Sequence, residues 1–153
     1  MISLSESVVI VVGVVRDCGG CLADEVLRLR QALHIARKVY FFLVESDSSD
    51  NTISVLKSMV DLVPDFAFAS LGSLADTHPL RTERIALCRN VYLGQLTSDK
   101  RYAQCNYVLV ADFDGVNRRI TYQALETCWT RSDWDVCTAN QDGPYYDIWA
   151  LRH

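Results

Sequence analysis

Two aspartates separated by one residue are the part of this sequence with the clearest capacity for chemistry. Asp112 and Asp114 directly follow an apolar run at 107–111. Carboxylate oxygens are hard ligands, so two carboxylates at this spacing can converge on one divalent cation. A cation held by few protein groups keeps positions open for phosphate oxygens and can neutralise a departing diphosphate. The alternative is an ordinary acidic turn after a strand, which chance produces often.

Two arginines lie in a stretch with helical periodicity at 82–96. This stretch carries an apolar stripe made of Ile85, Tyr92 and Leu96. Arg89 lies beside that stripe, and Arg84 flanks it from the other side. An arginine beside a buried face needs an anionic partner, because an unpaired buried charge is costly. That partner is either a carboxylate at the same edge or a phosphate, whose geometry the planar guanidinium suits.

Polar side chains also follow the first two apolar runs of the chain. Arg16 comes after Val8–Val15, and Glu45 and Asp47 come after the second run. Glu45 and Asp47 have spare acceptors for base, ribose or backbone donors, whereas Asp50 is expected to cap the following helix. The three histidines form no recognisable nucleophile arrangement with a cysteine or a serine.

Six cysteines raise the question of disulfides or a metal site. Several lie within apolar periodic segments, which favours reduced and partly buried thiols. Cys18 and Cys21 form a CxxC motif, but a structural zinc site needs four ligands and the chain has no second such pair. The pattern favours a glycine-containing turn into a helix. The alternative is a redox pair, because a helix N-terminus lowers the pKa of a thiol.

The apolar patterns predict alternating strands and helices. Strands are expected at 8–15, 39–44, 66–69, 107–111, 134–139 and 146–151, and helices at 22–36, 53–60, 82–96 and 120–129. This alternation predicts an α/β fold, with a mostly parallel, Rossmann-like sheet covered by helices on both faces. Ligands of such sheets bind at the carboxyl ends of the strands, near a reversal of strand order. The polar residues that follow the strands should therefore share one edge.

Composition excludes several classes of protein. The chain has 153 residues, half of them hydrophobic and 22% charged, which fits one globular domain spanning 1–153. A formal net charge of −4 argues against sequence-independent nucleic-acid binding, which needs a basic face. The apolar run Val8–Val15 is too short to span a bilayer, and Glu6 rather than a basic residue precedes it. We therefore expect a cytoplasmic protein with no transmembrane segment, associated with a membrane at most peripherally.

Several segments together resemble a glycosyltransferase of the GT-A fold. In that family an apolar strand ends in an acidic turn rich in serine and aspartate, as at 39–52 here. A helix with an Arg-Asn pair follows, as at 84–90, and then the strand that carries the DxD motif, as at 108–114. The segments 134–140 and 145–152 are similar to a stretch of capsule-type sugar transferases from microbes, viruses and fungi. The likeness covers nearly the whole chain.

The resemblance implies a metal-dependent enzyme of polysaccharide biosynthesis, which moves a sugar from a nucleotide-diphosphate donor to a glycan or other acceptor. It assigns nucleotide contacts to six residues, namely Arg16, Glu45, Asp47, Arg84, Arg89 and Asp112. The first three match positions that line the nucleoside, and the two later arginines match a helix that faces the diphosphate. Asp112 also matches the acid on the ribose or metal side, and Asp114 matches the direct ligand of Mn²⁺ or Mg²⁺.

The family normally continues well beyond the stretch at 145–152, whereas this chain stops at His153. The later part supplies acceptor contacts and, in inverting enzymes, the catalytic base. The resemblance therefore predicts a fragment or minimal version that is inactive or confined to donor binding and slow donor hydrolysis. Asp142 is the one acid offered here as the base, against the simpler interpretation of an Asp-Gly turn.

Two alternatives stay open beside the transferase. The segment 108–116 also resembles the opening motif of haloacid-dehalogenase-type phosphatases, with Asp112 as nucleophile and Asp114 as acid/base beside Mg²⁺. That chemistry needs a later lysine and a further pair of adjacent acids, and neither occurs after Asp114. The other alternative is a non-catalytic nucleotide-sugar-binding module, which predicts metal-dependent nucleotide binding without turnover.

Overall fold

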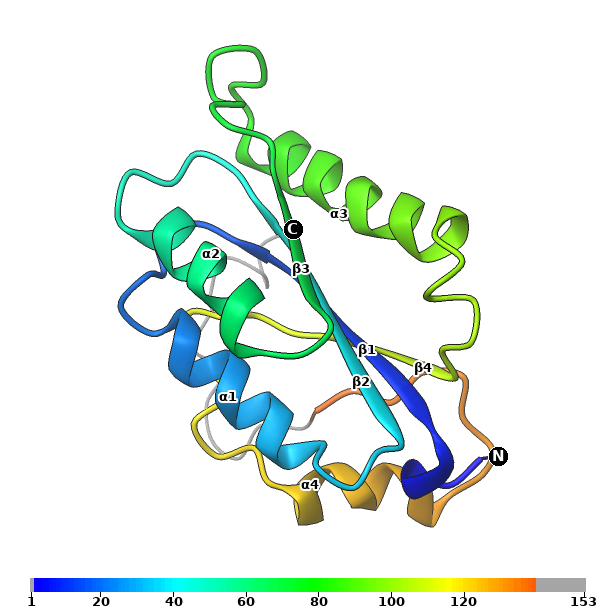
Figure 1. Ribbon diagram of the computed structural model, residues 1–153. Helices are drawn as coiled ribbons and strands as arrows, with labels where there is room; N and C mark the ends of the chain where they lie inside the picture. The colour runs from blue at the N-terminus through cyan, green and yellow to red at the C-terminus, as the bar shows by residue number, and fades with distance from the viewer. Residues whose placement is uncertain (1, 140–153) are drawn as a thin grey trace.

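In the computed structural model, which describes residues 2–139, strands and helices alternate along the chain (Figure 1). The strands are β1 (Val8–Val15), β2 (Lys38–Glu45), β3 (Phe66–Ser70) and β4 (Tyr107–Val110). The helices are α1 (Leu22–Ala32), α2 (Thr52–Leu62), α3 (Arg81–Ser98) and α4 (Tyr122–Glu126), with short 3₁₀ turns at Leu4–Glu6 and Thr127–Thr130. Within residues 2–139, no helix combines the length and the apolar character that crossing a membrane requires.

The four strands form one parallel sheet in the order β3-β2-β1-β4. In this register Val9 of β1 lies opposite Val39 of β2 and opposite Tyr107 of β4. The prediction of an α/β fold with a parallel, Rossmann-like sheet is confirmed. The chain moves outward from β1 to β2 and β3, and then returns to β4 on the other side of β1. Strand order therefore reverses between β1 and β4, which is where such sheets bind ligands.

Helices cover both faces of the sheet (Figure 1). On one face, Cys88 and Tyr92 of α3 pack against the cluster that contains Ile10 of β1. On the other face, α1, α2 and α4 pack against the cluster that contains Val9 and Val11. Because both faces are covered, β1 is a continuous valine-rich run instead of an alternating one. This explains why the strand predicted from the run ends at the same residues as the strand in the structure.

The strand predicted at 134–139 is wrong, because no residue of that segment joins the sheet. Instead, the indole N–H of Trp134 donates to the carbonyl oxygen of Cys128 at 2.6 Å. The Trp134 ring packs beside Trp129 and Tyr107, with centroid distances of 6.1 and 5.7 Å. The aromatic side chains thus cover one another without strand pairing. The strand predicted at 146–151 lies outside the described residues.

Several helix boundaries differ from the predictions. The N-cap of α2 is Asn51, not Asp50. Asp50 nevertheless serves the start of α2, because its carboxylate accepts the backbone N–H of Thr52 and that of Gly19, each at 2.9 Å. The helix predicted to reach residue 36 ends at Ala32, and the helix predicted at 120–129 is divided into α4 and a 3₁₀ turn.

Candidate functional site

A cavity of about 400 Å³ opens at the carboxyl ends of β1 and β4, where strand order reverses. Three segments form most of its lining. The end of β1 contributes residues 13–16, the end of β4 and the following loop contribute 110–114, and α3 contributes one face. Cys18, and Ser46 and Asp47 after β2, complete the lining. The cavity therefore lies at the edge of the sheet where the sequence predicted ligand binding.

Most of the residues predicted to bind nucleotide or metal line this cavity, namely Arg16, Asp47, Arg84, Arg89, Asp112 and Asp114. Glu45 is not among the lining residues, and it is only 1% exposed. Its carboxylate accepts the backbone N–H of Ser48 at 2.9 Å and the hydroxyl of Ser70. Glu45 therefore holds the turn after β2 against the end of β3. Asp142 lies outside the described residues.

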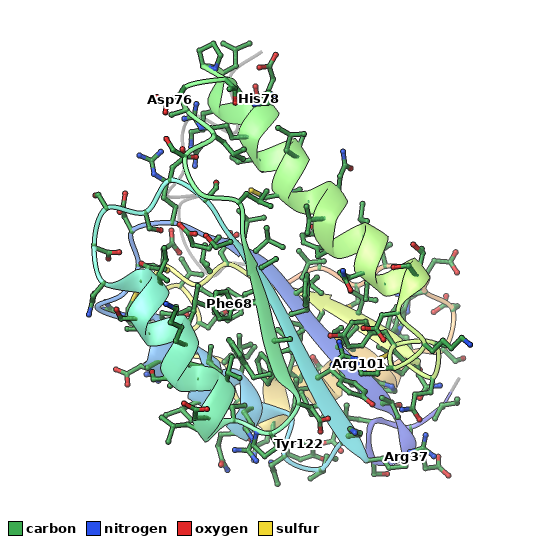
Figure 2. All side chains as sticks on the ribbon, turned by 45° about the horizontal axis from the view of Figure 1, so that its top comes forward. Arg37, Phe68, Asp76, His78, Arg101 and Tyr122 are labelled. Carbon is green, nitrogen blue, oxygen red and sulfur yellow. The ribbon has the colours of Figure 1, made fainter. Side chains whose placement is uncertain are left out.

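Arg84 and Asp47 form an ion pair inside the cavity wall. Arg84 Nε lies 3.4 Å from a carboxylate oxygen of Asp47, and the two side chains are 13% and 5% exposed. Arg84 Nη1 also donates to the carbonyl oxygen of His78 at 2.7 Å; His78 lies in the loop before α3 and is labelled in Figure 2. Asp47 accepts the backbone N–H of Ala75 in the same loop at 2.8 Å. Of the two partners that the sequence left open for Arg84, the structure thus shows the carboxylate.

The environment of Asp47 favours its charged form. Burial acts to raise the pKa of this carboxyl group. Hydrogen bonds from the Ala75 backbone and the Ser46 side chain, together with the Arg84 charge, lower the pKa below its ordinary value. At neutral pH the pair is therefore an internal ion pair that fixes the 72–79 loop to the site, with little charge left for a ligand.

Two arginines and two aspartates on the lining keep their charges available. Arg81 and Arg89 project from α3, and Asp112 and Asp114 follow β4. All four are exposed, and within residues 2–139 none of their side chains forms an ion pair or a side-chain hydrogen bond. The cavity therefore presents guanidinium groups on one wall and carboxylates on another.

Arg16 occupies the rim of the cavity at the end of β1. Its Nε lies 3.3 Å from a carboxylate oxygen of the neighbouring Asp17, and half of its side chain is exposed. A surface pair of this kind contributes little to stability. Asp17 is itself held by the backbone N–H of Ser49 at 2.7 Å, which helps to lower its pKa. Arg16 is therefore free to turn towards a ligand without loss to the fold.

Arg81 is a charged lining residue that the sequence reasoning missed. The predicted helix began one residue later, at 82, and so left Arg81 in the preceding loop. A signal was present, because Arg81, Ile85, Cys88 and Tyr92 are spaced i, i+4, i+7 and i+11 and share one face of α3. Extending the apolar stripe backward by one turn reaches this arginine.

The CxxC motif is the turn that begins α1. The backbone N–H groups of Cys21 and Leu22 donate to the carbonyl oxygen of Cys18 at 3.0 and 2.9 Å. Burial raises the pKa of Cys18 to about 11, and it also raises the pKa of Cys21. A redox-active pair needs a lowered thiol pKa. The structure therefore favours the turn over the redox alternative.

Alkaline pH is expected to destabilise the unaltered chain more than the Cys18→Ala variant. The pKa of Cys18 is about 11 in the folded chain against 9.0 ordinarily, so the fold favours the protonated thiol. This contribution is complete below pH 9 and is lost between pH 9 and 11, on the order of 2 kcal/mol. Urea unfolding of both proteins at pH 8, 9.5 and 10.5 measures it. If the free energies of unfolding of the two proteins changed with pH in parallel, the prediction would be contradicted.

The acidic residues of the cavity fit a cation that is shared with a ligand. Among residues 2–139, no group of three or more His, Cys, Asp or Glu side chains could hold a metal ion by itself. Asp112 and Asp114 line the same cavity as the free arginines. Mg²⁺-type ions are commonly held by one or two carboxylates together with substrate phosphates. The donor set therefore suits a metal–phosphate complex better than a closed structural site.

No match to this chain was found among protein-family models or among curated proteins. What the fold and the site define is a class of protein: a parallel α/β domain with a charged cavity at the reversal of strand order. A narrower function has to rest on the chemistry of that cavity.

Proposed function

We propose that this chain is the donor-binding domain of a metal-dependent glycosyltransferase of the GT-A type. Its ligand is a nucleotide-diphosphate sugar, whose sugar is transferred to a glycan acceptor. The observation that carries the proposal is the charge arrangement of the cavity at the β1–β4 reversal. Arg81 and Arg89 share this cavity with Asp112 and Asp114, and the four side chains form no ion pair with any residue of 2–139.

Each charged group has a role in this proposal. Asp112 and Asp114 hold Mn²⁺ or Mg²⁺, and the bound cation supplies positive charge to the departing nucleoside diphosphate. Arg89 and Arg81 donate to diphosphate oxygens, because a guanidinium group presents two parallel N–H groups to such oxygens. Arg16 lies towards the nucleoside. Without the cation, the negative charges of Asp112 and Asp114 offset the positive charges of Arg81 and Arg89. Diphosphate binding should therefore need the metal.

Calorimetric titration tests the proposal. UDP, GDP, dTDP and CDP are each titrated with and without Mn²⁺. We expect one of these nucleotides to bind and its binding to vanish when the metal is chelated. Failure of all four to bind would contradict the proposal. Hydrolysis of a phosphate monoester in that case would support the phosphatase alternative. Metal-dependent binding without sugar transfer or donor hydrolysis would support the non-catalytic module.

Arg89→Ala is expected to weaken the selected nucleoside diphosphate about 10- to 100-fold, because a hydrogen bond to a charged group is lost. Affinity for the corresponding nucleoside, which has no phosphate, should change little. Arg30→Ala is the matched control, since Arg30 is exposed on α1 and does not line the cavity. Calorimetry on the three proteins measures the difference. Equal weakening of nucleoside and diphosphate would contradict the assignment of Arg89 to the diphosphate.

A further inference from the structure

A buried carboxylate on α1 contacts the loop that carries the two cavity aspartates. Glu25 lies in the first turn of α1 and is only 2% exposed. A carboxylate that deep needs hydrogen-bond donors, because an unpartnered buried charge is costly. Its Oε2 accepts both the backbone N–H of Asn117, at 2.9 Å, and the side-chain amide of Asn117, at 2.7 Å.

Asn117 continues this contact to the first aspartate. Its Nδ2 group also donates to the backbone carbonyl oxygen of Asp112 at 2.6 Å. A side-chain amide has two N–H donors, and here one serves Glu25 and the other Asp112. Glu25, Asn117 and the Asp112 backbone thus form one continuous hydrogen-bonded chain between α1 and the loop.

Two further side chains of α1 and its preceding turn hold the same loop. Cys21 Sγ lies 3.4 Å from the carbonyl oxygen of Phe113, and Arg28 Nη1 donates to the carbonyl oxygen of Arg118 at 3.1 Å. Cys21, Glu25 and Arg28 are spaced i, i+4 and i+7, so they form one stripe along the helix. This stripe fastens the backbone of the loop 112–118 at several points.

The aspartate side chains themselves lack such support. Asp112 and Asp114 are exposed, and their carboxylates accept no hydrogen bond within residues 2–139. Two carboxylates bind a cation well only when the surrounding structure holds them at the right separation, because otherwise the cation must order them on binding. In this loop, the support available comes from the backbone contacts to α1.

We propose that Glu25 and Asn117 are positioning residues for the cation site at Asp112 and Asp114. They act on the loop backbone and touch neither the cation nor the nucleotide. The role in cation binding rests on the proposed function, whereas the fastening of the loop does not. Loss of either side chain should loosen the loop and lower the affinity for the cation by about 10- to 100-fold, as for other residues that orient metal ligands.

Three variants and a control separate this role from general stability. Glu25→Leu removes the acceptor, Asn117→Ala removes the donor to Asp112, and Glu25→Gln keeps an acceptor oxygen and should restore the contact. Asn117→Ala also covers the case in which Glu25→Leu fails to fold. Thr121→Ala is the control, because it removes the α4 N-cap hydrogen bond to Ala124, at 3.1 Å, without touching the loop.

Two measurements on the full chain decide the proposal. Amide hydrogen exchange of residues 112–117 reports the loop, and electron paramagnetic resonance of added Mn²⁺ alone reports cation affinity. Glu25→Leu and Asn117→Ala should show faster loop exchange and weaker Mn²⁺ binding, while Glu25→Gln and Thr121→Ala resemble the unaltered chain. Unchanged Mn²⁺ affinity in both loop variants would overturn the positioning role. If the unaltered chain binds no Mn²⁺ in the absence of nucleotide, the positioning role fails, the nucleotide titration decides the proposed function separately, and exchange alone decides whether α1 fastens the loop.

Discussion

Replacing Asp114 with alanine is expected to abolish metal-dependent nucleotide binding, with a loss of at least about 100-fold, or roughly 2.7 kcal/mol. Asp114 is exposed and lines the cavity, so the change removes a cation ligand without opening the core. The free energy of unfolding should therefore stay within about 0.5 kcal/mol.

Calorimetry with Mn²⁺ measures the loss of nucleotide binding in Asp114→Ala, and urea unfolding measures its stability. A lost cation ligand leaves the free energy of unfolding nearly unchanged, whereas a damaged fold lowers it. Asp61→Ala is the matched control, since Asp61 is an exposed aspartate of α2 outside the cavity lining. Metal-dependent affinity that survives in Asp114→Ala would show that the site assignment is wrong.

Gly13→Ala is expected to destabilise the fold by about 1–3 kcal/mol, through overpacking of the sheet next to the cavity. A Cβ atom at Gly13 would lie 2.5 Å from the backbone oxygen of Ala111 and 2.6 Å from the ring of Phe113. The backbone after β4 cannot yield as a flexible side chain would. The Ala111 N–H is also bonded to the Val12 oxygen at 2.9 Å, so a shift here disturbs the sheet.

Thermal unfolding measures this loss, which corresponds to a decrease in Tm of about 3–10 °C. Nucleotide affinity should fall as well, because Ala111 is followed directly by Asp112. Gly94→Ala is the control, since Gly94 is exposed on α3 and an added Cβ meets nothing within 4 Å. A helical glycine replaced by alanine should gain about 0.5–1 kcal/mol. A Gly13→Ala protein as stable as the unaltered chain would contradict the close packing of β1 against the segment after β4.

The composition of the cavity was largely predictable because it follows from the ends of strands. A buried parallel strand is a short apolar run, and its end is marked by the first polar residues, as at Val8–Val15 and Arg16. Strands that run in parallel bring those ends to one edge. Arg16, Asp112 and Asp114 could therefore be placed together without any long-range information.

Which of these charges are free was not predictable, because that depends on partners distant in sequence. The Glu45 carboxylate accepts a hydrogen bond from the Ser70 hydroxyl. The Asp47 carboxylate pairs with Arg84 and accepts a hydrogen bond from the backbone N–H of Ala75. No local pattern distinguishes these acids from Asp112 and Asp114. The strand predicted at 134–139 failed for the same reason, since its one aromatic residue, Trp134, packs against Tyr107 and the segment does not pair with the sheet.

The sequence by itself determined the α/β class, the extent of β1 and the edge at which the charged residues gather. These depend on hydrophobic periodicity, which each segment carries within its own residues. The tertiary structure alone decided the strand order β3-β2-β1-β4 and the support of the Asp112 loop by Glu25. These depend on hydrogen bonds and packing between residues as far apart as 25 and 117, which exist only once the chain has folded.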